Sequence, residues 1–379
     1  MMYNLIATTS FGLEAVTAKE LKQLGYEDLI VENGRVTFKG DEMDIAICNI
    51  WLRTAERLFI KMAEFNALSF EELFQGTLAV DWGNLIPEDG KMHIVGKSVK
   101  SQLHSVPDCQ GIVKKAVVEA MKKKYDSEWF SEEGPVYKIE VAILRDTVTL
   151  SIDTSGVGLH KRGYREYSGE APLKETLAAA LVLISKWDTT RVLADPLCGS
   201  GTIAIEAALI GKNIAPGINR NFVSETWPNM ESDIWEQVRG GARQTVNSNE
   251  VEILASDIDG SLLRTAIQNA EKAGVKDCIK FQKIPMQSFT SRQKYGVIIT
   301  NPPYGERMGE LQEVKKLHND FGEMYRSLNE WSCFVITANK DFQKDFGNKA
   351  DKNRKLYNGR LLCYYYQYIK EVPRKKKED

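Results

Sequence analysis

Residues 192–202 read Val-Leu-Ala-Asp-Pro-Leu-Cys-Gly-Ser-Gly-Thr, and this stretch decides the fold. Its apolar start predicts a short buried strand, and the residues after Thr202 have the apolar spacing of a helix. Between the two, Gly199 and Gly201 let the backbone turn tightly and approach a ligand closely. The start of the helix presents unpaired N–H groups, which favour a nucleotide-like ligand. The stretch therefore predicts a strand, a cofactor-binding turn and a helix.

Strand and helix patterns alternate from the helix expected at residues 173–185 to the end of the chain. Such alternation predicts a mostly parallel, doubly wound sheet. The last two strands, residues 352–357 and 360–369, meet at Asn358-Gly359, which is typical of a type I′ hairpin. We therefore expect an α/β, Rossmann-like domain whose sheet ends in an antiparallel hairpin.

Shorter elements precede this domain. Strand-like and helix-like runs predict one small α+β unit over residues 3–51 and a second one between residues 65 and 153. Residues 156–169 carry glycines and charges without apolar periodicity, which indicates a connection over the surface. We therefore place domains at residues 1–64, 65–155 and 171–379, with a linker at residues 156–170.

The composition argues against several classes of protein. The 379 residues are 43% hydrophobic and 27% charged, as in ordinary globular proteins. No segment offers the ~18 uninterrupted apolar residues of a membrane helix, and the start lacks a basic leader, so we expect a cytoplasmic protein with no membrane partner. Six cysteines and four histidines are scattered, which argues against a metal site. With a net charge of −2, nucleic-acid binding would depend on local basic patches.

An acidic cluster supports a nucleotide site. The strand expected at residues 251–256 ends in Asp257-Ile258-Asp259, and an acid at the carboxyl end of a strand is placed to bind ribose hydroxyls. A dinucleotide fingerprint would put this acid about 20 residues after the glycines, and a third glycine where Ala204 stands. Both departures disfavour a nicotinamide enzyme.

A proline-stiffened loop, Asn301-Pro302-Pro303-Tyr304, follows the strand expected at residues 295–300. The lone pair of an exocyclic amino group is delocalised into its ring, so acceptors must bind its hydrogens before it can attack a methyl sulfonium. The Asn301 side-chain oxygen and the Pro302 carbonyl are two such acceptors. Tyr304 is expected to stack on a base withdrawn from its helix or loop. Positioning should supply most of the rate, so no strong general base is needed.

These motifs resemble those of class I methyltransferases that act on amino groups, including DNA adenine, RNA guanine-N2 and protein glutamine methyltransferases. Asp195-x-x-x-Gly199-x-Gly201-Thr202 is similar to their first motif, and Asp257 to their ribose-binding acid. The longer strings at residues 159–165, 171–178 and 301–307 resemble more specifically the THUMP-domain rRNA guanine-N2 methyltransferases. This resemblance covers essentially the whole chain and implies ferredoxin-like, THUMP and methyltransferase domains in that order.

The resemblance also implies a cofactor, partners and site residues. The cofactor is S-adenosylmethionine, with S-adenosylhomocysteine as product and no metal; the partners are ribosomal RNA, 23S in particular, and the assembling large ribosomal subunit. The implied catalytic residues are Asn301, Pro302, Pro303 and Tyr304. The implied cofactor contacts are Leu173, Lys174, Glu175, Thr176, Asp195, Pro196, Cys198, Gly199, Ser200, Gly201, Thr202, Asp257, Ile258 and Asp259. Met286 and Gln287 are the nearest candidates for the adenine, because residues 283–288 lack the acid that the family usually has there.

Contacts to RNA are predicted from basic and aromatic residues. The candidates are Lys161, Arg162, Tyr164, Arg165 and Arg307, although residues 161–165 also fit a solvated linker. The lysines between residues 114 and 124 fit a phosphate-binding face or, as we prefer, the polar side of an amphipathic helix. Trp227 and Trp235, in an insertion at residues 211–250, fit either a satellite core or a substrate wall.

Three other functions remain open at this level. The Asn-Pro-Pro-Tyr loop also permits N6-adenine methylation of DNA, although no strongly basic target-recognition domain is evident. It permits protein glutamine methylation as well, which would not need the N-terminal modules. A non-catalytic RNA-binding factor of ribosome assembly is the third alternative. The leading hypothesis is methyl transfer to the N2 of a guanine in 23S rRNA.

Overall fold

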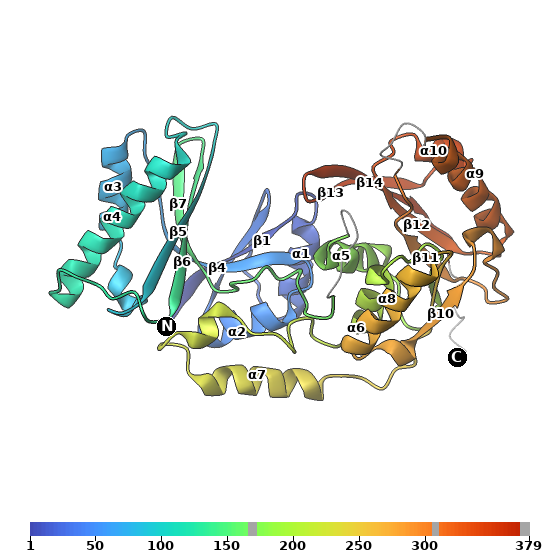
Figure 1. The fold of residues 1–379 in the computed structure, drawn as a ribbon, viewed down its shortest axis with the longest axis horizontal. Helices are drawn as coiled ribbons and strands as arrows, with labels where there is room; N and C mark the ends of the chain where they lie inside the picture. Colours follow the sequence, from blue (N-terminus) through green and yellow to red (C-terminus); the bar gives the residue numbers. More distant parts are fainter. Residues whose placement is uncertain (166–172, 305–310, 372–379) are drawn as a thin grey trace, which may run out of the picture. The chain divides into compact units, whose positions relative to one another are not determined.

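The computed structural model describes residues 1–165, 173–304 and 311–371, and the chain divides into two compact units. The first, here called the N-terminal unit, comprises Met1–Thr9, Ala18–Leu159 and Arg220–Gly241. The second, the C-terminal unit, comprises Ser10–Thr17, His160–Asn219 and Ala242–Asp379. Each unit is built around one seven-stranded sheet (Figure 1).

The sheet of the N-terminal unit has the strand order β2-β3-β1-β4-β7-β6-β5. Its strands are β1 (Tyr3–Thr9), β2 (Ile30–Glu32), β3 (Arg35–Gly40), β4 (Ala55–Asn66), β5 (Lys91–Val99), β6 (Val136–Leu144) and β7 (Thr147–Asp153). The helices in this part of the sequence are α1 (Glu14–Gln23), α2 (Glu42–Trp51), α3 (Phe70–Leu78), η1 (Trp82–Asn84) and α4 (Val106–Tyr125). Figure 1 shows α3 and α4 together on one face of β5, β6 and β7.

Local sequence explains where two of these helices begin. At α2, the Asp41 side chain accepts from the Asp44 backbone N–H, and the Asp44 side chain accepts from the Asp41 N–H. Ser69 and Glu72 make the same reciprocal pair at the start of α3. Each pair satisfies backbone donors that the first helical turn leaves unpaired, and so fixes the position at which the helix starts.

The long strand β4 joins the two predicted α+β modules into one sheet. Residues along β4 pair with β1 from Ala55 to Lys61, and with β7 from Phe59 to Asn66. The predicted division between residues 64 and 65 falls inside this strand. Sequence patterning missed β4 because Leu58, Phe59 and Ile60 are consecutive apolar residues, all buried, so apolar and polar residues do not alternate there.

Residues 220–241, which lie within the predicted insertion, belong to the N-terminal unit and contain η2 (Val223–Thr226) and most of α7 (Ser232–Gln244). Trp227 is 1% exposed, stacks on Tyr137 at 4.7 Å between ring centroids, and donates to the Val136 carbonyl. Trp235 is also buried and stacks on Phe222. The two tryptophans are therefore a satellite core of this unit.

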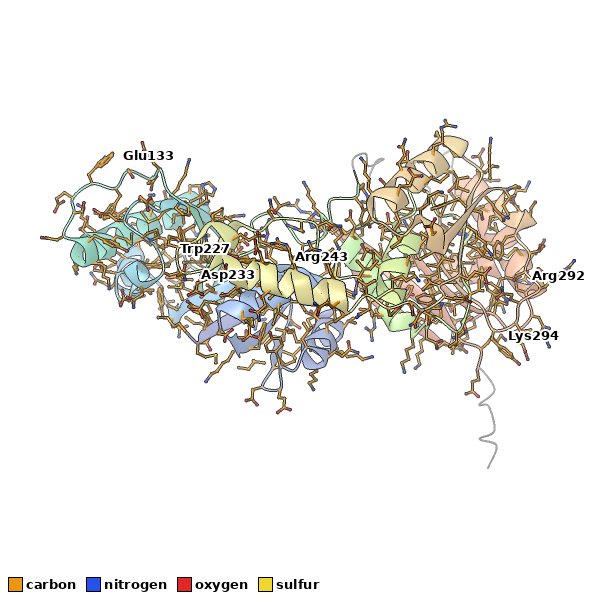
Figure 2. The ribbon with its side chains drawn as sticks, turned by 90° about the horizontal axis from the view of Figure 1, so that it is seen from below. Glu133, Trp227, Asp233, Arg243, Arg292 and Lys294 are labelled. Atoms are coloured by element: carbon orange, nitrogen blue, oxygen red, sulfur yellow. The ribbon has the colours of Figure 1, made fainter. Side chains whose placement is uncertain are left out.

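Charges on α7 also suit a helix. Asp233 lies in its first turn and Arg243 in its last, as the labels in Figure 2 show. An acid near the N-terminus and a base near the C-terminus of a helix complement its dipole. The insertion thus contains one helix whose end charges complement its dipole.

The sheet of the C-terminal unit has the order β10-β9-β8-β11-β12-β14-β13. Its strands are β8 (Leu193–Asp195), β9 (Ile253–Asp257), β10 (Ile279–Lys283), β11 (Val297–Thr300), β12 (Ser332–Thr337), β13 (Lys352–Asn358) and β14 (Leu361–Tyr368). The helices are α5 (Glu175–Ser185), α6 (Thr202–Gly211), α8 (Gly260–Lys272), η3 (Lys276–Cys278), η4 (Met286–Ser288), α9 (Leu311–Ser327) and α10 (Phe342–Phe346). Strands β10, β9, β8, β11 and β12 are parallel, and β14 and β13 are antiparallel additions, which confirms the predicted fold class.

Apolar residues on the two faces of this sheet form two cores. Leu193, Val297 and Ile299 belong to the core shared with α5, α6 and α8. Their sequence neighbours Ala194 and Ile298 belong to the other core, shared with α9 and α10. Successive side chains of a strand point to opposite faces, so a continuous apolar run is what a sheet covered on both faces requires.

The final hairpin differs from the sequence prediction by one residue. Asn358 pairs with Leu361, so the two-residue turn is Gly359-Arg360 and not Asn358-Gly359. Gly359 has φ +64°, whereas Asn358 and Arg360 are not among the residues with positive φ. A type I′ turn needs positive φ at both central residues, and a type II′ turn only at the first. The predicted type I′ turn is therefore wrong.

Across the described ranges, we find no helix that combines the length and the apolar character needed to span a membrane.

Candidate active site

The order of the strands brings the two predicted loops to one place. The chain runs from β8 outward through β9 to β10, and then returns to place β11 on the other side of β8. Ligands of doubly wound sheets bind outside the carboxyl ends of the strands at such a reversal. The loops after β8 and β11, which contain Gly199 and Asn301, therefore lie next to each other at this edge.

The glycine-rich loop has the predicted setting of strand, turn and helix. Gly199 and Gly201 have φ values of +53° and +81°, in the left-handed region that favours glycine. Gly201 caps α6, and a Cβ added there would lie 3.0 Å from the Cβ of Ala266. A Cβ added at Gly199 would meet no heavy atom of the described residues within 4 Å. The loop is thus closely packed at Gly201 and open at Gly199, where a ligand has room to approach.

Asp257, at the end of β9, is tied to this loop. One carboxylate oxygen accepts from the Gly199 N–H at 2.9 Å and the other from the Asp259 N–H at 2.9 Å. The Asp259 side chain caps α8 by accepting from the Ser261 N–H, and the intervening Ile258 is 67% exposed. Each carboxylate oxygen retains acceptor capacity, so Asp257 can hold the loop and still accept from ribose hydroxyls.

Asp195 connects the two loops. Its carboxylate accepts from the Thr300 hydroxyl at 2.6 Å and from the Leu197 N–H at 3.3 Å. The residue is 1% exposed, and burial raises the pKa of its carboxyl to about 7. We predicted that Asp195 contacts the cofactor; because it is buried, we now assign its carboxylate to holding the loop in place. Sequence reasoning missed its partner Thr300, which only the pairing of β8 with β11 reveals.

Several other predicted cofactor residues also point into the interior. Thr176 is fully buried and Leu173 is 6% exposed, both near the start of α5. In the glycine-rich loop Cys198 is 7% exposed, and burial raises the pKa of its thiol well above the usual value. Pro196 and Thr202 are buried as well. These side chains are withdrawn from solvent, so any contact that these residues make with a ligand must come mainly from backbone groups.

Of the two candidates for the adenine, Met286 is wrong as a side-chain contact, whereas the exposed Gln287 stays a prediction. Met286 is 2% exposed and belongs to the core between the sheet and α9. The amide of Gln287 donates to Asp320 on α9 at 3.0 Å. Both side chains are therefore engaged with α9 or its core.

The Asn301–Tyr304 loop directly follows β11. The Tyr304 hydroxyl donates to the Asn301 side-chain oxygen at 2.5 Å. Pro302 is buried and Pro303 is exposed, while the Tyr304 ring packs in part against the core that includes α5 and α6. The asparagine oxygen is thus oriented within the loop, and it has a second lone pair with which to accept from an amino group.

The predicted RNA contacts at residues 161–165 need correction. Arg162 has a side chain only 3% exposed, with its Nε 3.6 Å from a carboxylate oxygen of Glu206. Tyr164 is 4% exposed and donates to the same carboxylate oxygen at 3.0 Å. A buried carboxylate needs such partners, and this explains why these two residues lie inside and not on RNA. Lys161 is exposed and remains a predicted contact; Arg307 lies outside the described residues.

The arrangement fits the nucleoside of S-adenosylmethionine. Gly199 leaves open space, and Asp257 offers acceptors beside it. Asn301 follows the neighbouring strand, so an amino group held by its side-chain oxygen would lie at the same edge of the sheet. When bound, the cofactor supplies an electrophilic methyl group; the protein's part is to align the two reactants.

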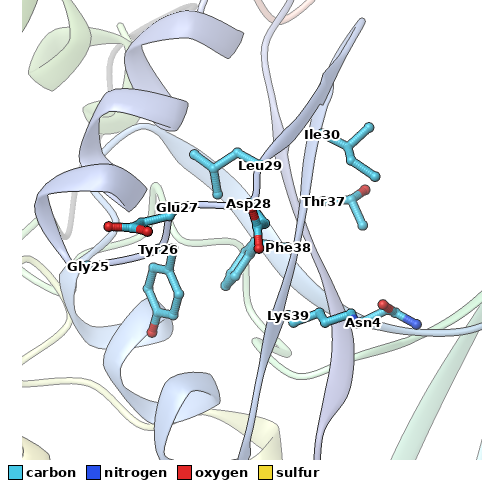
Figure 3. Close-up of a pocket in the computed structure, with 10 residues that line it drawn as sticks. All are labelled: Asn4, Gly25, Tyr26, Glu27, Asp28, Leu29, Ile30, Thr37, Phe38 and Lys39. Atoms are coloured by element: carbon cyan, nitrogen blue, oxygen red, sulfur yellow. The ribbon is translucent and has the colours of Figure 1, made fainter.

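A separate hollow lies in the N-terminal unit, between the end of α1 and the edge of the sheet (Figure 3). It has a volume of about 810 Å³. Its lining residues are Asn4, Gly25, Tyr26, Glu27, Asp28, Leu29, Ile30, Thr37, Phe38 and Lys39. The set contains none of the predicted site residues, so we do not assign this hollow to the methylation site.

The fold and the two adjacent loops define a class I methyltransferase. Residues 162–367 match the family described as "RMKL-like, methyltransferase domain", and the chain belongs to this family. Residues 4–59 match the "RlmL ferredoxin-like domain" and residues 67–153 the "THUMP domain". The N-terminal unit therefore combines ferredoxin-like and THUMP modules in its single sheet.

Two curated proteins illustrate the family. The chain is 49% identical over 381 residues to "Putative RNA methyltransferase YpsC" of Bacillus subtilis (strain 168), covering 100% of this chain and 99% of that protein. It is 33% identical over 373 residues to "Ribosomal RNA large subunit methyltransferase K/L" of Legionella pneumophila (strain Corby). That match covers 97% of this chain but only 53% of the larger protein.

Two solved structures share the fold over almost their whole length. SMU.472, described as "a putative methyltransferase complexed with SAH", is 45% identical with a TM-score of 0.93, covering 98% of this chain and 99% of that one. A protein from Listeria monocytogenes str. 4b F2365, described as "a predicted N6-adenine-specific DNA methylase", is 48% identical with a TM-score of 0.94. That match covers 98% of this chain and 97% of the Listeria chain.

Proposed function

We propose that this chain transfers the methyl group of S-adenosylmethionine to the exocyclic N2 of a guanine in 23S rRNA. The observation that carries the proposal is the position of Asn301 beside the glycine-rich loop, at the reversal of the sheet. A planar amino nitrogen needs an acceptor at the point where the methyl donor is held, and the Asn301 oxygen meets this need.

The choice of RNA rests on the N-terminal unit and on the named relatives. Ferredoxin-like and THUMP modules precede the methyltransferase domain, and the Legionella pneumophila relative carries rRNA methyltransferase in its name. The exposed Lys161 immediately precedes the segment that enters the methyltransferase domain, and it remains our candidate for a phosphate contact. The same relatives support S-adenosylmethionine as the cofactor, since SMU.472 was crystallised with SAH.

N6-adenine methylation of DNA is the second candidate, because the Listeria monocytogenes protein bears that description at 48% identity. The Asn301–Tyr304 loop alone does not distinguish the two reactions, since both acceptors are exocyclic amino groups on a purine. The distinction must come from the nucleic acid that the N-terminal unit binds, where the 2′-hydroxyl marks RNA.

The test is to incubate the full chain with methyl-labelled S-adenosylmethionine and, separately, 23S rRNA, large-subunit precursor particles or duplex DNA. The rRNA and particles come from cells that lack the gene. Nucleoside analysis should find N2-methylguanosine in rRNA or particles. Label found only as N6-methyl-2′-deoxyadenosine in DNA would replace our proposal with the second candidate. Absence of label from every substrate, with RNA binding intact, would favour the non-catalytic assembly factor.

An Asn301→Ala variant tests whether the Asn301 side-chain oxygen takes part in methyl transfer. Losing a preorganised group of this kind costs a rate factor of about 10² to 10³, and RNA affinity should remain that of the wild type. The matched control is Asn353→Ala, an exposed asparagine on β13 of the same unit, which should methylate normally. Unchanged methylation by Asn301→Ala would remove this residue from the mechanism.

A further inference from the structure

The segment formed by residues 162–165 lies against one face of α6, the helix that follows the glycine-rich loop. Thr202 and Glu206 are four residues apart and therefore share that face. Arg162 and Tyr164 contact the carboxylate of Glu206, and Arg165 donates to the hydroxyl of Thr202. The segment thus contacts α6 at two successive turns.

Arg165 also contacts the start of α5. Its Nη2 donates to the Leu173 carbonyl at 3.1 Å as well as to Thr202. Its Nη1 lies 3.5 Å from a carboxylate oxygen of Glu175, the first residue of α5. The two charged side chains are 11% and 5% exposed, so solvent screens their interaction little. One guanidinium therefore bridges the first turns of α5 and α6.

Helix stability alone does not explain a cation in this place. A positive charge beside the N-terminus of a helix is disfavoured by the helix dipole, and Arg165 stands beside two such ends. The planar guanidinium is, however, suited to fixing the separation of several acceptors, because its donors point in set directions. The two helix starts that it joins are both segments to which we assign the cofactor.

We propose that Arg165 is a positioning residue for the cofactor loop: it sets the start of α6 against the start of α5, so that the glycine-rich turn is ordered before S-adenosylmethionine binds. This inference rests on the proposed use of that cofactor. It replaces the RNA contact predicted for Arg165 from the sequence. The ordering that Arg165 provides lowers the entropy lost on binding, and its loss should therefore appear in cofactor affinity.

The test is calorimetric titration of the full chain with S-adenosylhomocysteine (SAH). Thermal unfolding and RNA affinity are measured on the same variants. Arg165→Lys keeps the positive charge but loses the planar set of guanidinium donors. We expect this variant to bind SAH about tenfold more weakly, which is the effect of losing one charge-assisted hydrogen bond. RNA affinity should not change. Glu175→Gln should weaken SAH binding too, and the double variant should lose less than the sum of the two effects, because the residues act through each other.

Arg239→Lys is the matched control. Arg239 also joins a carboxylate, that of Glu225, to a backbone carbonyl, that of Arg220, but in the N-terminal unit. If Arg165→Lys binds SAH like the wild type, or if Arg239→Lys weakens SAH binding equally, the inference is overturned. If Arg165→Lys lost RNA affinity but kept its SAH affinity, the result would support the RNA contact predicted from the sequence instead. A wild-type chain that binds no SAH would overturn the proposed function itself, a different result from a defect confined to the variants.

Discussion

The two seven-stranded sheets of this chain are built on different plans. In the C-terminal unit five neighbouring strands run parallel, so all their carboxyl ends meet at one edge. In the N-terminal unit the central strands β1, β4 and β7 alternate in direction, and their carboxyl ends are divided between two edges. Parallel order gathers Asp195, Asp257 and Asn301 at a single site. The alternating strands β1, β4 and β7 of the other sheet do not bring their carboxyl ends together in this way.

Trp227→Ala is expected to have the largest effect on the free energy of unfolding, and this effect should be confined to the N-terminal sheet. Trp227 is almost fully buried in the N-terminal unit, and replacing such a residue costs about 3–5 kcal/mol in free energy of unfolding. Hydrogen exchange should show lost protection along β6, whose Val136 carbonyl accepts from the indole, and normal protection of β8 and β9.

The control is Trp129→Ala, since that side chain is 74% exposed and its loss should change the free energy of unfolding by less than about 0.5 kcal/mol. Equal loss of protection in both sheets after Trp227→Ala would contradict the separation of the two sheets, because the two units would then unfold as one.

An intermediate effect is expected from Asp257→Ala at the carboxyl edge of the parallel sheet. Removing hydrogen bonds to a charged group costs about 1.5–3 kcal/mol, so SAH affinity measured by calorimetry should fall about tenfold to a hundredfold. Asp277 lies in η3, which precedes β10 and so marks the amino edge, and Asp277→Ala should bind SAH normally. If both variants lost SAH affinity to a similar degree, position at the carboxyl edge of the sheet would not explain the binding of SAH.

The effect of pH is graded, and it is the smallest of the three for a single step of one pH unit. Burial raises the pKa of Asp195 from 3.8 to about 7, so the folded protein holds this proton more tightly than the unfolded chain. The resulting stabilisation is complete below about pH 4 and is lost as pH rises through 7, at no more than about 1.4 kcal/mol per pH unit. The Asp195→Asn side chain stays neutral at every pH. The Tm of the variant minus that of the wild type should therefore increase between pH 5 and pH 7 and stay constant above pH 8. A difference that does not vary with pH would show that Asp195 has an ordinary pKa.

Local patterns predicted the site better than its surroundings. The glycine turn and the Asn301–Tyr304 loop were placed correctly after their strands, since strand, turn and helix signals lie within a few residues of each other. The hairpin turn was misplaced by one residue, because pairing register and not composition selected Gly359-Arg360. Strand β4 was missed because its consecutive buried residues 58–60 lack the alternation of a strand.

The sequence by itself determined the fold class and the glycine turn at Gly199 and Gly201, and it predicts the amino-group chemistry of Asn301. The tertiary structure alone decided which charged residues are buried. Arg162 and Tyr164 look like a solvated, RNA-binding stretch until they are seen to meet Glu206, more than 40 residues further along the chain. A buried charge is stable only beside its partner, and no local pattern records a partner that the fold brings from so far away.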